Sequence, residues 1–326
     1  YIHLLISCNF IMDGWLNLYK PRGISSAKAV ALVKRHFRGS KIGHTGTLDL
    51  EAEGVLPLAI GQATKLVSIL MDAKKQYSFT IQFGAQTTTG DAAGEIIKET
   101  TYIPSEEECL AIVLKFIGQI EQTPPAYSAL KVNGVRAYKL ARENKIFELK
   151  KRIITIYDLR LLSYDGPNNR STYLADCSKG TYIRTLAEDV SLSLQSLGFV
   201  IELRRTKVGI FNEENSVNVA DLDSGTFDYI KSKCLKIEDV LDDIPVLEVD
   251  ELTAKKVRFG QHVSFPGLTG ESTLFMDSPV KPGNDNPSGD DKMCWLKHNN
   301  KILAIGSLHD GSFKSSRVFN YIENGE

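Results

Sequence analysis

Residues 43–58, GHTGTLDLEAEGVLPL, join a glycine-rich loop to an apolar run. Glycine permits tight backbone geometry and close approach by a ligand, so residues 43–54 are expected to form a loop. The apolar run at 55–60 predicts a short buried strand directly after it. Asp49, held between this loop and strand, is placed where a carboxylate can serve as a nucleophile, although an aspartate in a turn more often only caps the backbone. His44, taken alone, is likewise more often structural than catalytic.

The strongest strand pattern elsewhere is QYSFTIQF at residues 76–83, in which polar and apolar side chains alternate. Tyr77 shares the apolar face with Phe79 and Phe83, so periodicity alone places it in the core. Helices and strands follow one another without regular βαβ alternation, which indicates an α+β fold on a mixed, largely antiparallel sheet. The other expected elements are strands at 14–18, 153–163, 172–178 and 201–208, and helices that begin at Ser25 or Ser26, span Ala63–Met71, follow Ser105 to about Ile117, and run from Thr181 to about Leu197.

A change of composition late in the chain predicts a second domain. Residues 213–251 contain twelve acidic side chains against three lysines, and Ile244-Pro245 offers a boundary. Beyond it, short apolar runs separated by glycine and proline predict a small β-rich domain over 244–326, which leaves 12–243 for the first domain. The segment 278–292 is rich in proline, glycine, asparagine and aspartate and is expected to be a mobile loop. The apolar runs lie at 257–267, 273–276, 293–297, 301–308 and 316–322.

The first residues, 1–11, are apolar, but they carry no lysine or arginine and no small-residue cleavage site follows them, so they do not fit a signal peptide. A membrane-spanning helix needs about 20 apolar residues. We therefore expect 1–11 to be a disordered or artefactual extension ahead of a natural start at Met12. The sequence has no other long apolar run, so we expect a cytoplasmic protein with no membrane partner.

Composition argues against several classes of protein. Hydrophobic residues make up 42% of the 326 residues and charged residues 24%, which is typical of a soluble globular protein. The five cysteines form no CxxC pair and the six histidines are scattered, so the sequence shows no metal-ligand spacing. It also lacks a Walker-type phosphate loop and a dinucleotide-binding fingerprint. We expect neither a metal ion nor another cofactor.

The formal net charge of −1 hides local basic segments. Residues 20–48 contain seven basic side chains and no acidic one, and 131–152 contains eight basic side chains against two acidic ones. Phosphate contacts need such local patches more than a large net charge, whereas the plain alternative is a solvated helix face. A third, shorter basic set is formed by Arg204, Arg205 and Lys207.

The longer stretch 43–66, GHTGTLDLEAEGVLPLAIGQATKL, resembles the signature of the TruB family of tRNA pseudouridine synthases. The resemblance continues in the family's order over about residues 14–210. It departs from the family at Leu50, because proline usually follows the family's aspartate and would restrict its backbone. The other similar segments are LNLYKPRGISS (16–26), KKQYSFTIQFGAQTTTGDAAGEI (74–96), TPPAYSALKVNGVRAYKLAR (123–142) and CSKGTYIRTLAEDV (177–190).

The resemblance implies an isomerase that converts uridine 55 in the T-loop of tRNA to pseudouridine. Asp49 would be the nucleophile on an extruded base, acting at C1′, at C6 or along a glycal-forming path. Arg184 would be its cationic partner, since a guanidinium can pair with a carboxylate through two hydrogen bonds. Tyr77 would stack on the base and take part in proton transfer. The further residues expected to contact the base are His44, Tyr182 and Leu203.

The same resemblance implies how the RNA would be held. The insertion at 124–152 would clamp the stem of the tRNA T-arm through its phosphates, and RNA shape would supply much of the specificity. The C-terminal domain is similar to PUA-type RNA-binding modules, and no obligate protein partner is expected. Lys20 with Pro21 would support the loop that carries Asp49. The RNA-binding residues expected in the insertion are Lys131, Arg136, Arg142, Lys150, Lys151 and Arg152.

Three alternative functions share part of this sequence pattern. A non-catalytic RNA-binding protein on this scaffold would make Asp49 dispensable, and the intact set of Asp49, Tyr77 and Arg184 argues against it. A guide-dependent synthase acting on ribosomal RNA within a complex shares the motifs, but we associate the long insertion with stand-alone action. A glycosidase would use Asp49 as nucleophile, yet only Glu51 and Glu53 lie nearby and neither has a clear acid role.

Overall fold

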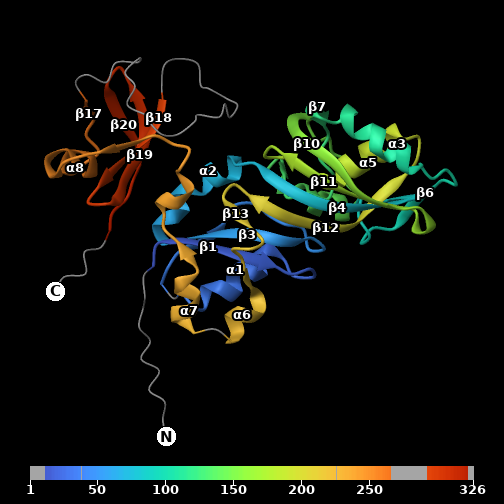
Figure 1. The fold of residues 1–326 in the computed structure, drawn as a ribbon, viewed down its shortest axis with the longest axis horizontal. Coiled ribbons are helices and arrows are strands. Elements are labelled where there is room, and N and C mark those ends of the chain that lie inside the picture. The colour runs from blue at the N-terminus through green and yellow to red at the C-terminus, as the bar shows by residue number, and fades with distance from the viewer. Residues whose placement is uncertain (1–11, 38, 225, 266–291, 322–326) are drawn as a thin grey trace, which may run out of the picture.

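A computed structural model shows the mixed α+β fold predicted from the sequence (Figure 1). A large, mostly antiparallel sheet forms the body of the molecule, and a smaller sheet lies toward the C-terminus. The expected N-terminal extension at 1–11, the apolar run at 273–276 and nearly all of the expected loop at 278–292 lie outside the described residues. No helix among the described residues has the length and hydropathy to cross a membrane. The residues that the structure describes are 12–37, 39–224, 226–265 and 292–321.

The large sheet is the framework of the molecule. Its strands within the described residues are β1 (Gly14–Lys20), β2 (Ile42–His44), β3 (Glu53–Ile60), β4 (Lys75–Phe83), β7 (Gly118–Gln122), β10 (Arg152–Asp165), β11 (Arg170–Cys177), β12 (Gly198–Val208), β13 (Phe211–Asn212), β14 (Val217–Asn218) and β15 (Cys234–Leu235). The main path runs β14-β1-β3-β12-β4-β11-β10-β7. Neighbours on this path are antiparallel except where β1 meets β14 and β3 meets β12. Two short hairpins, β5 (Ala85–Thr87) with β6 (Ile96–Glu99) and β8 (Lys131–Val132) with β9 (Val135–Arg136), stand apart from it.

Helices pack on the large sheet around separate cores. One core joins β1 and β3 to α1, α6 and α7, and a second joins β4, β10 and β11 to α3 and α5. Tyr77 and Leu203 pack against both cores, so they mark the line where the two meet. The helices are α1 (Ser26–Lys34), α2 (Val67–Asp72), α3 (Glu106–Ala111), α4 (Ala137–Arg142), α5 (Ile183–Ser193), α6 (Val219–Ser224), α7 (Phe227–Ser232) and α8 (Glu251–Arg258), with short 3₁₀ turns at Gly61–Leu66, Ile112–Lys115, Gly166–Asn168 and Glu238–Val240.

β4 has the alternation predicted for 76–83, with Phe79, Ile81 and Phe83 buried. It pairs with β11 on one side and β12 on the other, which sets Tyr77 opposite Arg205 of β12. β12 in turn runs parallel to the start of β3, where Arg205 pairs with Gly54. This register brings the loop 45–52, called here the Asp49 loop, beside the two central strands.

Two helix starts are confirmed and a third is wrong. Ser25 caps α1, because its Oγ accepts from the Lys28 amide at 3.1 Å, and Ser105 forms the expected capping box with Glu108. Thr181 does not cap α5, since its hydroxyl donates to the Ser178 carbonyl at 3.0 Å and Tyr182 occupies the N-cap position. The helix also ends at Ser193 rather than near Leu197. Gln195, two residues after this end, adopts a positive φ of 58°.

The smaller sheet lies in the region expected to form the β-rich domain. Its order is β16-β18-β19-β20-β17, with the apolar run at 301–308 inside its central strand. The run at 257–267 was expected to be extended, but it begins inside α8, which Asp250 caps through the Thr253 amide at 2.8 Å. The strands are β16 (Val246–Glu248), β17 (Val263–Ser264), β18 (Lys292–His298), β19 (Lys301–His309) and β20 (Ser312–Val318).

The smaller sheet shares a core with the large one. Trp295 and Phe319 from the C-terminal part pack in one cluster with Trp15 and Leu66 from the N-terminal part. Lys65 adds a polar link, because its Nζ donates to the Val318 carbonyl at 2.6 Å. Burial of such large side chains contributes about 2 kcal/mol or more each, so the C-terminal part is fixed against the body of the fold.

Candidate active site

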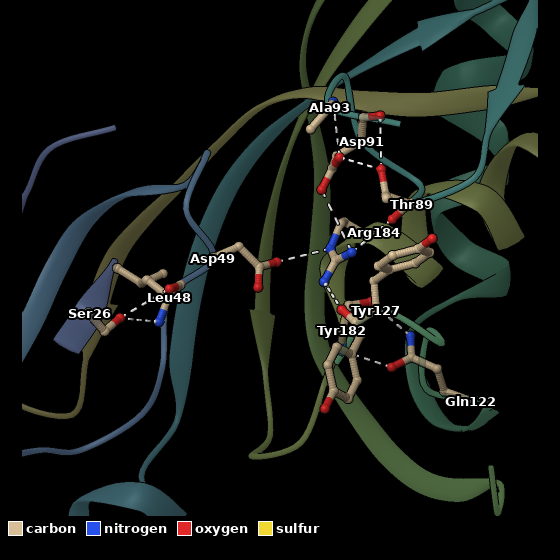
Figure 2. A network of polar contacts seen from close by, with 10 residues as sticks. All are labelled: Ser26, Leu48, Asp49, Thr89, Asp91, Ala93, Gln122, Tyr127, Tyr182 and Arg184. Carbon is tan, nitrogen blue, oxygen red and sulfur yellow. Dashed lines mark hydrogen bonds and ion pairs between the residues drawn. The ribbon is translucent and has the colours of Figure 1, made fainter. Parts of the chain in front are cut away.

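The Asp49 loop meets α5 through one ion pair. Arg184 Nε lies 2.9 Å from Asp49 Oδ2 (Figure 2). The arginine side chain is 5% exposed, whereas the aspartate side chain is 44% exposed. The cation is therefore part of the protein interior, and the carboxylate next to it remains open to a ligand.

Backbone carbonyls hold the rest of the Arg184 guanidinium. Nη1 donates to the Thr89 carbonyl at 2.8 Å and Nη2 donates to the Tyr127 carbonyl at 2.9 Å. The resemblance allowed two hydrogen bonds between this guanidinium and Asp49. In the structure Nε alone points to the Asp49 carboxylate, because Nη1 and Nη2 donate to backbone carbonyls (Figure 2). A guanidinium held at three corners is a fixed point of positive charge.

Asp91 is a member of this network that sequence reasoning missed. Its Oδ2 lies 3.7 Å from Arg184 Nη1, and its Oδ1 accepts from the Thr89 hydroxyl at 2.6 Å and the Ala93 amide at 3.1 Å. The Asp91 side chain is itself mostly buried. The TTTGD segment that contains Asp91 does not predict this contact, because the contact depends on where α5 lies in the fold.

The Asp49 loop is anchored on both sides of the aspartate. The Ser26 hydroxyl accepts from the Leu48 amide at 2.9 Å and donates to the Leu48 carbonyl at 3.0 Å. Lys20 Nζ donates to the carbonyl of Leu50 at 3.5 Å, and the Gly23 amide donates to the same oxygen at 2.9 Å. Leu50, which replaces the family's usual proline, therefore serves through its main chain while its side chain stays exposed.

Lys20 is fully buried beneath this loop. Its ammonium also donates to the carbonyls of Pro21 at 2.9 Å and Ile24 at 2.8 Å. Burial lowers the pKa of Lys20 to about 8, against the opposing pull of the carboxylates of Asp49 and Glu51. The geometry matches the expectation that Lys20 supports the loop from behind.

Tyr77 and His44 lie on the interior side of the loop. Tyr77 is partly buried between the two cores, and burial raises the pKa of its phenol while the Arg205 guanidinium opposes that rise. Burial also lowers the pKa of His44, and the charge of Arg205 acts in the same direction, so the imidazole is neutral near pH 7. The Gly46 amide points to His44 Nδ1 at 3.3 Å, which leaves the ring proton on Nε2.

A small open pocket lies beside the ion pair. Its polar wall includes Asp49, Asp91 and Arg184, and its apolar wall includes Ile201 and Leu203. Tyr77, His44 and Tyr182 are not among its lining residues. Of the residues expected to contact the base, Leu203 is thus the one that lines the same pocket as the Asp49 carboxylate. The remaining lining residues are Arg22, Glu51, Ala52, Ala92 and Val200.

Tyr182 is held at the start of α5 by Gln122. The Gln122 side chain accepts from the Tyr182 amide at 2.8 Å and donates to its carbonyl at 3.1 Å (Figure 2). The guanidinium carbon of Arg152 lies 5.5 Å from the centre of the Tyr182 ring. Gln122 ends β7 just before the 124–152 insertion, so both ends of that insertion contact this part of the site.

Comparison with known proteins places this chain in a family. The sequence models of the TruB family pseudouridylate synthase N-terminal domain and of the tRNA pseudouridylate synthase B C-terminal domain match residues 34–183 and 184–245. A tRNA pseudouridine synthase B of Rickettsia bellii is 57% identical over 306 residues, covering 94% of this chain and 98% of that protein. The chain belongs to the TruB family. The protein of the same name in Rickettsia africae is 50% identical over 341 residues, covering 95% and 98%.

Solved structures share the fold of this TruB family chain. A crystal structure of a Cbf5-Nop10-Gar1 complex matches with a TM-score of 0.68 and 23% identity, covering 94% of this chain and 84% of that one. An H/ACA RNP bound to a substrate RNA containing 2′-deoxyuridine matches with a TM-score of 0.67 and 21% identity, covering 94% and 85%. At this level of identity the likeness establishes the fold alone.

The basic side chains expected to grip RNA lie mostly on the surface of the TruB family chain. Arg152 is half-buried, and Lys151 pairs with Glu121 at 2.8 Å. Arg136 donates to the Ala129 carbonyl. The exposed ones are Lys131, Arg136, Arg142, Lys150 and Lys151.

Metal-binding geometry is absent from the part of the chain that the structure describes. No group of three or more histidine, cysteine, aspartate or glutamate side chains there is arranged to hold a metal ion.

Proposed function

We propose that this protein isomerises uridine 55 in the T-loop of tRNA to pseudouridine, with Asp49 as the nucleophile. The observation that carries the proposal is the pair formed by an exposed carboxylate and a buried, fixed guanidinium in a chain of the TruB family. The buried Arg184 guanidinium pairs with the Asp49 carboxylate, and a carboxylate is the form that a nucleophile needs. Membership of the family supplies the reaction class.

The reaction breaks the N1–C1′ bond of uridine, turns the base, and joins C5 to C1′. The proton on C5 is lost and N1 gains one, so the product is an isomer and no oxidant or energy source is consumed. Asp49 serves this sequence by attacking C1′, by attacking C6, or by assisting a glycal-forming path. Each route requires the base to leave the RNA stack and to reach the Asp49 carboxylate.

The residues that line the pocket supply both an apolar and a charged surface. We assign Ile201 and Leu203 to contacts with the ring of the extruded base, and Asp49 and Arg184 to its sugar side. We assign Tyr77 to stacking and proton transfer, and His44 and Tyr182 to contacts with the base. Tyr77 keeps its hydroxyl proton at neutral pH because burial raises its pKa, so it would meet the base as a neutral phenol.

We assign tRNA binding to the 124–152 insertion and to the C-terminal domain. The relatives named tRNA pseudouridine synthase B support tRNA as the substrate. Exposed lysine and arginine side chains on the insertion are suited to phosphates of the T-arm stem. The protein would act without an obligate protein partner in the cytoplasm.

The proposal is tested with the purified full chain and an unmodified tRNA transcript, with no added nucleotide. Tritium release from a transcript labelled at C5 of uridine measures turnover, and chemical mapping locates the pseudouridine. We expect one modified position, 55, and no product from a transcript with cytidine there. A protein that binds the transcript but forms no pseudouridine would be the non-catalytic RNA binder instead, and modification elsewhere would reject the T-loop as substrate.

A further inference from the structure

Arg205 was grouped by sequence with Arg204 and Lys207 as a surface basic set, and the structure separates it from them. The Arg205 side chain is 2% exposed, whereas Arg204 points to solvent and lies 3.4 Å from Glu213. Successive side chains of a strand point to opposite faces, so adjacent arginines on β12 have different surroundings. The surface assignment is wrong for Arg205, and a buried guanidinium needs another explanation.

The Arg205 side chain joins the start of the Asp49 loop to β3, the strand that follows this loop. Its Nε donates to the Val55 carbonyl at 2.8 Å, and its Nη2 donates to the Gly46 carbonyl at 3.2 Å. Gly46 precedes Asp49 and Val55 follows it. One planar group therefore connects a residue near the start of the loop with the strand into which the loop runs.

The two glycines that flank Asp49, Gly46 and Gly54, both lie close to Arg205. A Cβ atom on Gly54 would lie 2.2 Å from the Arg205 carbonyl oxygen, and Gly54 has a φ of +108°. A Cβ atom on Gly46 would lie 3.5 Å from Arg205 Nη1. Glycine at 54 is thus required by the close approach of β12, and the guanidinium lies directly beneath Gly46.

Arg205 also contacts Tyr77. The two residues are paired across β4 and β12, so the Arg205 guanidinium lies near enough to the Tyr77 phenol to act on it through its charge. The guanidinium opposes the burial that raises the pKa of Tyr77, and it lowers the pKa of His44 further. Its contacts therefore reach both the loop that carries the proposed nucleophile and the aromatic ring proposed to stack on the base.

We infer that Arg205 is a positioning residue for the isomerisation: one buried guanidinium on β12 holds the start of the Asp49 loop against β3, directly opposite Tyr77 on β4. The inference rests on the function proposed above. Arg205 acts through its neighbours and does not line the pocket beside Asp49. Lysine cannot replace it, because a single ammonium on a flexible stem lacks the planar fork that reaches the Val55 and Gly46 carbonyls together.

The test compares Arg205→Lys and Arg205→Met with the same two substitutions at Arg170. Arg170 lies at the start of β11, is exposed, and donates to the Gln82 side chain at 2.8 Å, so it controls for loss of a sheet arginine. The single-turnover rate of pseudouridine formation, the Kd for tRNA and the thermal unfolding curve are measured for each full-length variant. A variant with a lower rate and an unchanged Kd has lost positioning, whereas a variant with a higher Kd has lost RNA binding. The unfolding curve gives the folded fraction of each variant.

We expect Arg205→Lys to lower the single-turnover rate by about 100-fold, since a misplacement of about 1 Å has that effect, with Kd within about threefold of the wild type. The Arg170 variants should match the wild type in both quantities. If Arg205→Met does not fold, the lysine variant decides. A folded Arg205→Lys protein with a rate within threefold of wild type, or with its whole defect in Kd, overturns the inference. A wild-type protein that forms no pseudouridine overturns the proposed function instead.

Discussion

Arg184 contacts Asp49 through a single nitrogen, Nε, at 2.9 Å, while carbonyl oxygens of Thr89 and Tyr127 hold its other nitrogens. The two partners of this ion pair are therefore held unequally: Arg184 has further hydrogen bonds that fix its position. The guanidinium stays in place whatever the carboxylate does, because its other bonds do not depend on Asp49. The carboxylate can turn toward a ligand and return to the same cation, which suits a group that must bond transiently and then be released.

Arg184→Lys should lower the single-turnover rate by about 100-fold or more, because an ammonium cannot satisfy Thr89, Tyr127 and Asp49 at once. Rapid-quench measurement of pseudouridine formation at saturating enzyme checks this. Arg160→Lys is the matched control, since Arg160 is exposed and pairs with Asp158 on its own strand at 2.7 Å. A rate for Arg184→Lys equal to that of the control would show that a fixed fork of donors is not needed.

Asp91→Asn should lower the rate by about 10-fold, because it removes a charge beside Arg184 but keeps an oxygen for the Thr89 hydroxyl and the Ala93 amide. Asp91→Ala should be worse, since those two donors also lose their acceptor. The measurement is again the single-turnover rate, with Asp158→Asn as the control. Equal rates for the asparagine and alanine variants would contradict a role for the local hydrogen bonds.

We expect the rate of isomerisation to depend on pH in the alkaline range because of Lys20. Burial lowers its pKa to about 8, so the ammonium that holds the Asp49 loop is present below pH 8 and is lost as pH rises through that value. The sign for stability is opposite, because between pH 8 and 10.5 the unfolded lysine binds a proton that the folded one lacks, and the burial penalty is relieved as pH rises. The single-turnover rate should therefore fall above about pH 8 without a matching loss of stability.

Lys20→Met provides the comparison for this pH effect. We expect a variant that is slower by about 10-fold at pH 7, since the loop loses one set of donors, and whose rate shows no step near pH 8. Rates measured from pH 7 to 9.5 in both proteins decide the point. An alkaline step of the same size and midpoint in Lys20→Met assigns the step to another group.

The insertion should govern how tRNA binding responds to salt. Reversing Lys150, Lys151 and Arg152 to glutamate should weaken tRNA binding and flatten the plot of log Kd against log salt, because fewer counterions are released from phosphates. Titration by fluorescence anisotropy at several salt concentrations measures both. The matched control reverses Lys231, Lys233 and Lys236, three exposed side chains in and after α7, for the same change of net charge. An equal effect in both triple variants would leave no specific role for the insertion.

Local patterns predict much of the framework of this protein. The alternation in β4 and the caps at Ser25 and Ser105 depend on residues within a few positions of one another, so the sequence contains all the information they need. The start of α5 shows where this fails. Thr181 has the side chain of a cap, but Gln122, 60 residues away, holds Tyr182 in that place.

The site itself is built from long-range contacts that no local pattern contains. The family signature predicts Asp49 and Arg184, and the fold brings them together. The signature does not predict a role for Asp91, because that role depends on Arg184 of α5. It does not predict a role for Arg205 either, because its acceptor Val55 lies 150 residues away in the sequence. Charge counting even places Arg205 on the surface, because composition does not tell which face of a strand an arginine occupies.

The central claim is that the Asp49 carboxylate performs the isomerisation, and Asp49→Asn tests it most directly. Pseudouridine at position 55 of a tRNA transcript and the Kd for that transcript are measured in parallel, with Asp176→Asn, on strand β11, as the control. We predict no pseudouridine above the enzyme-free background, with Kd within about threefold of the wild type, because asparagine keeps the shape of the side chain and removes its charge. Pseudouridine formation by Asp49→Asn at the wild-type rate would contradict the account.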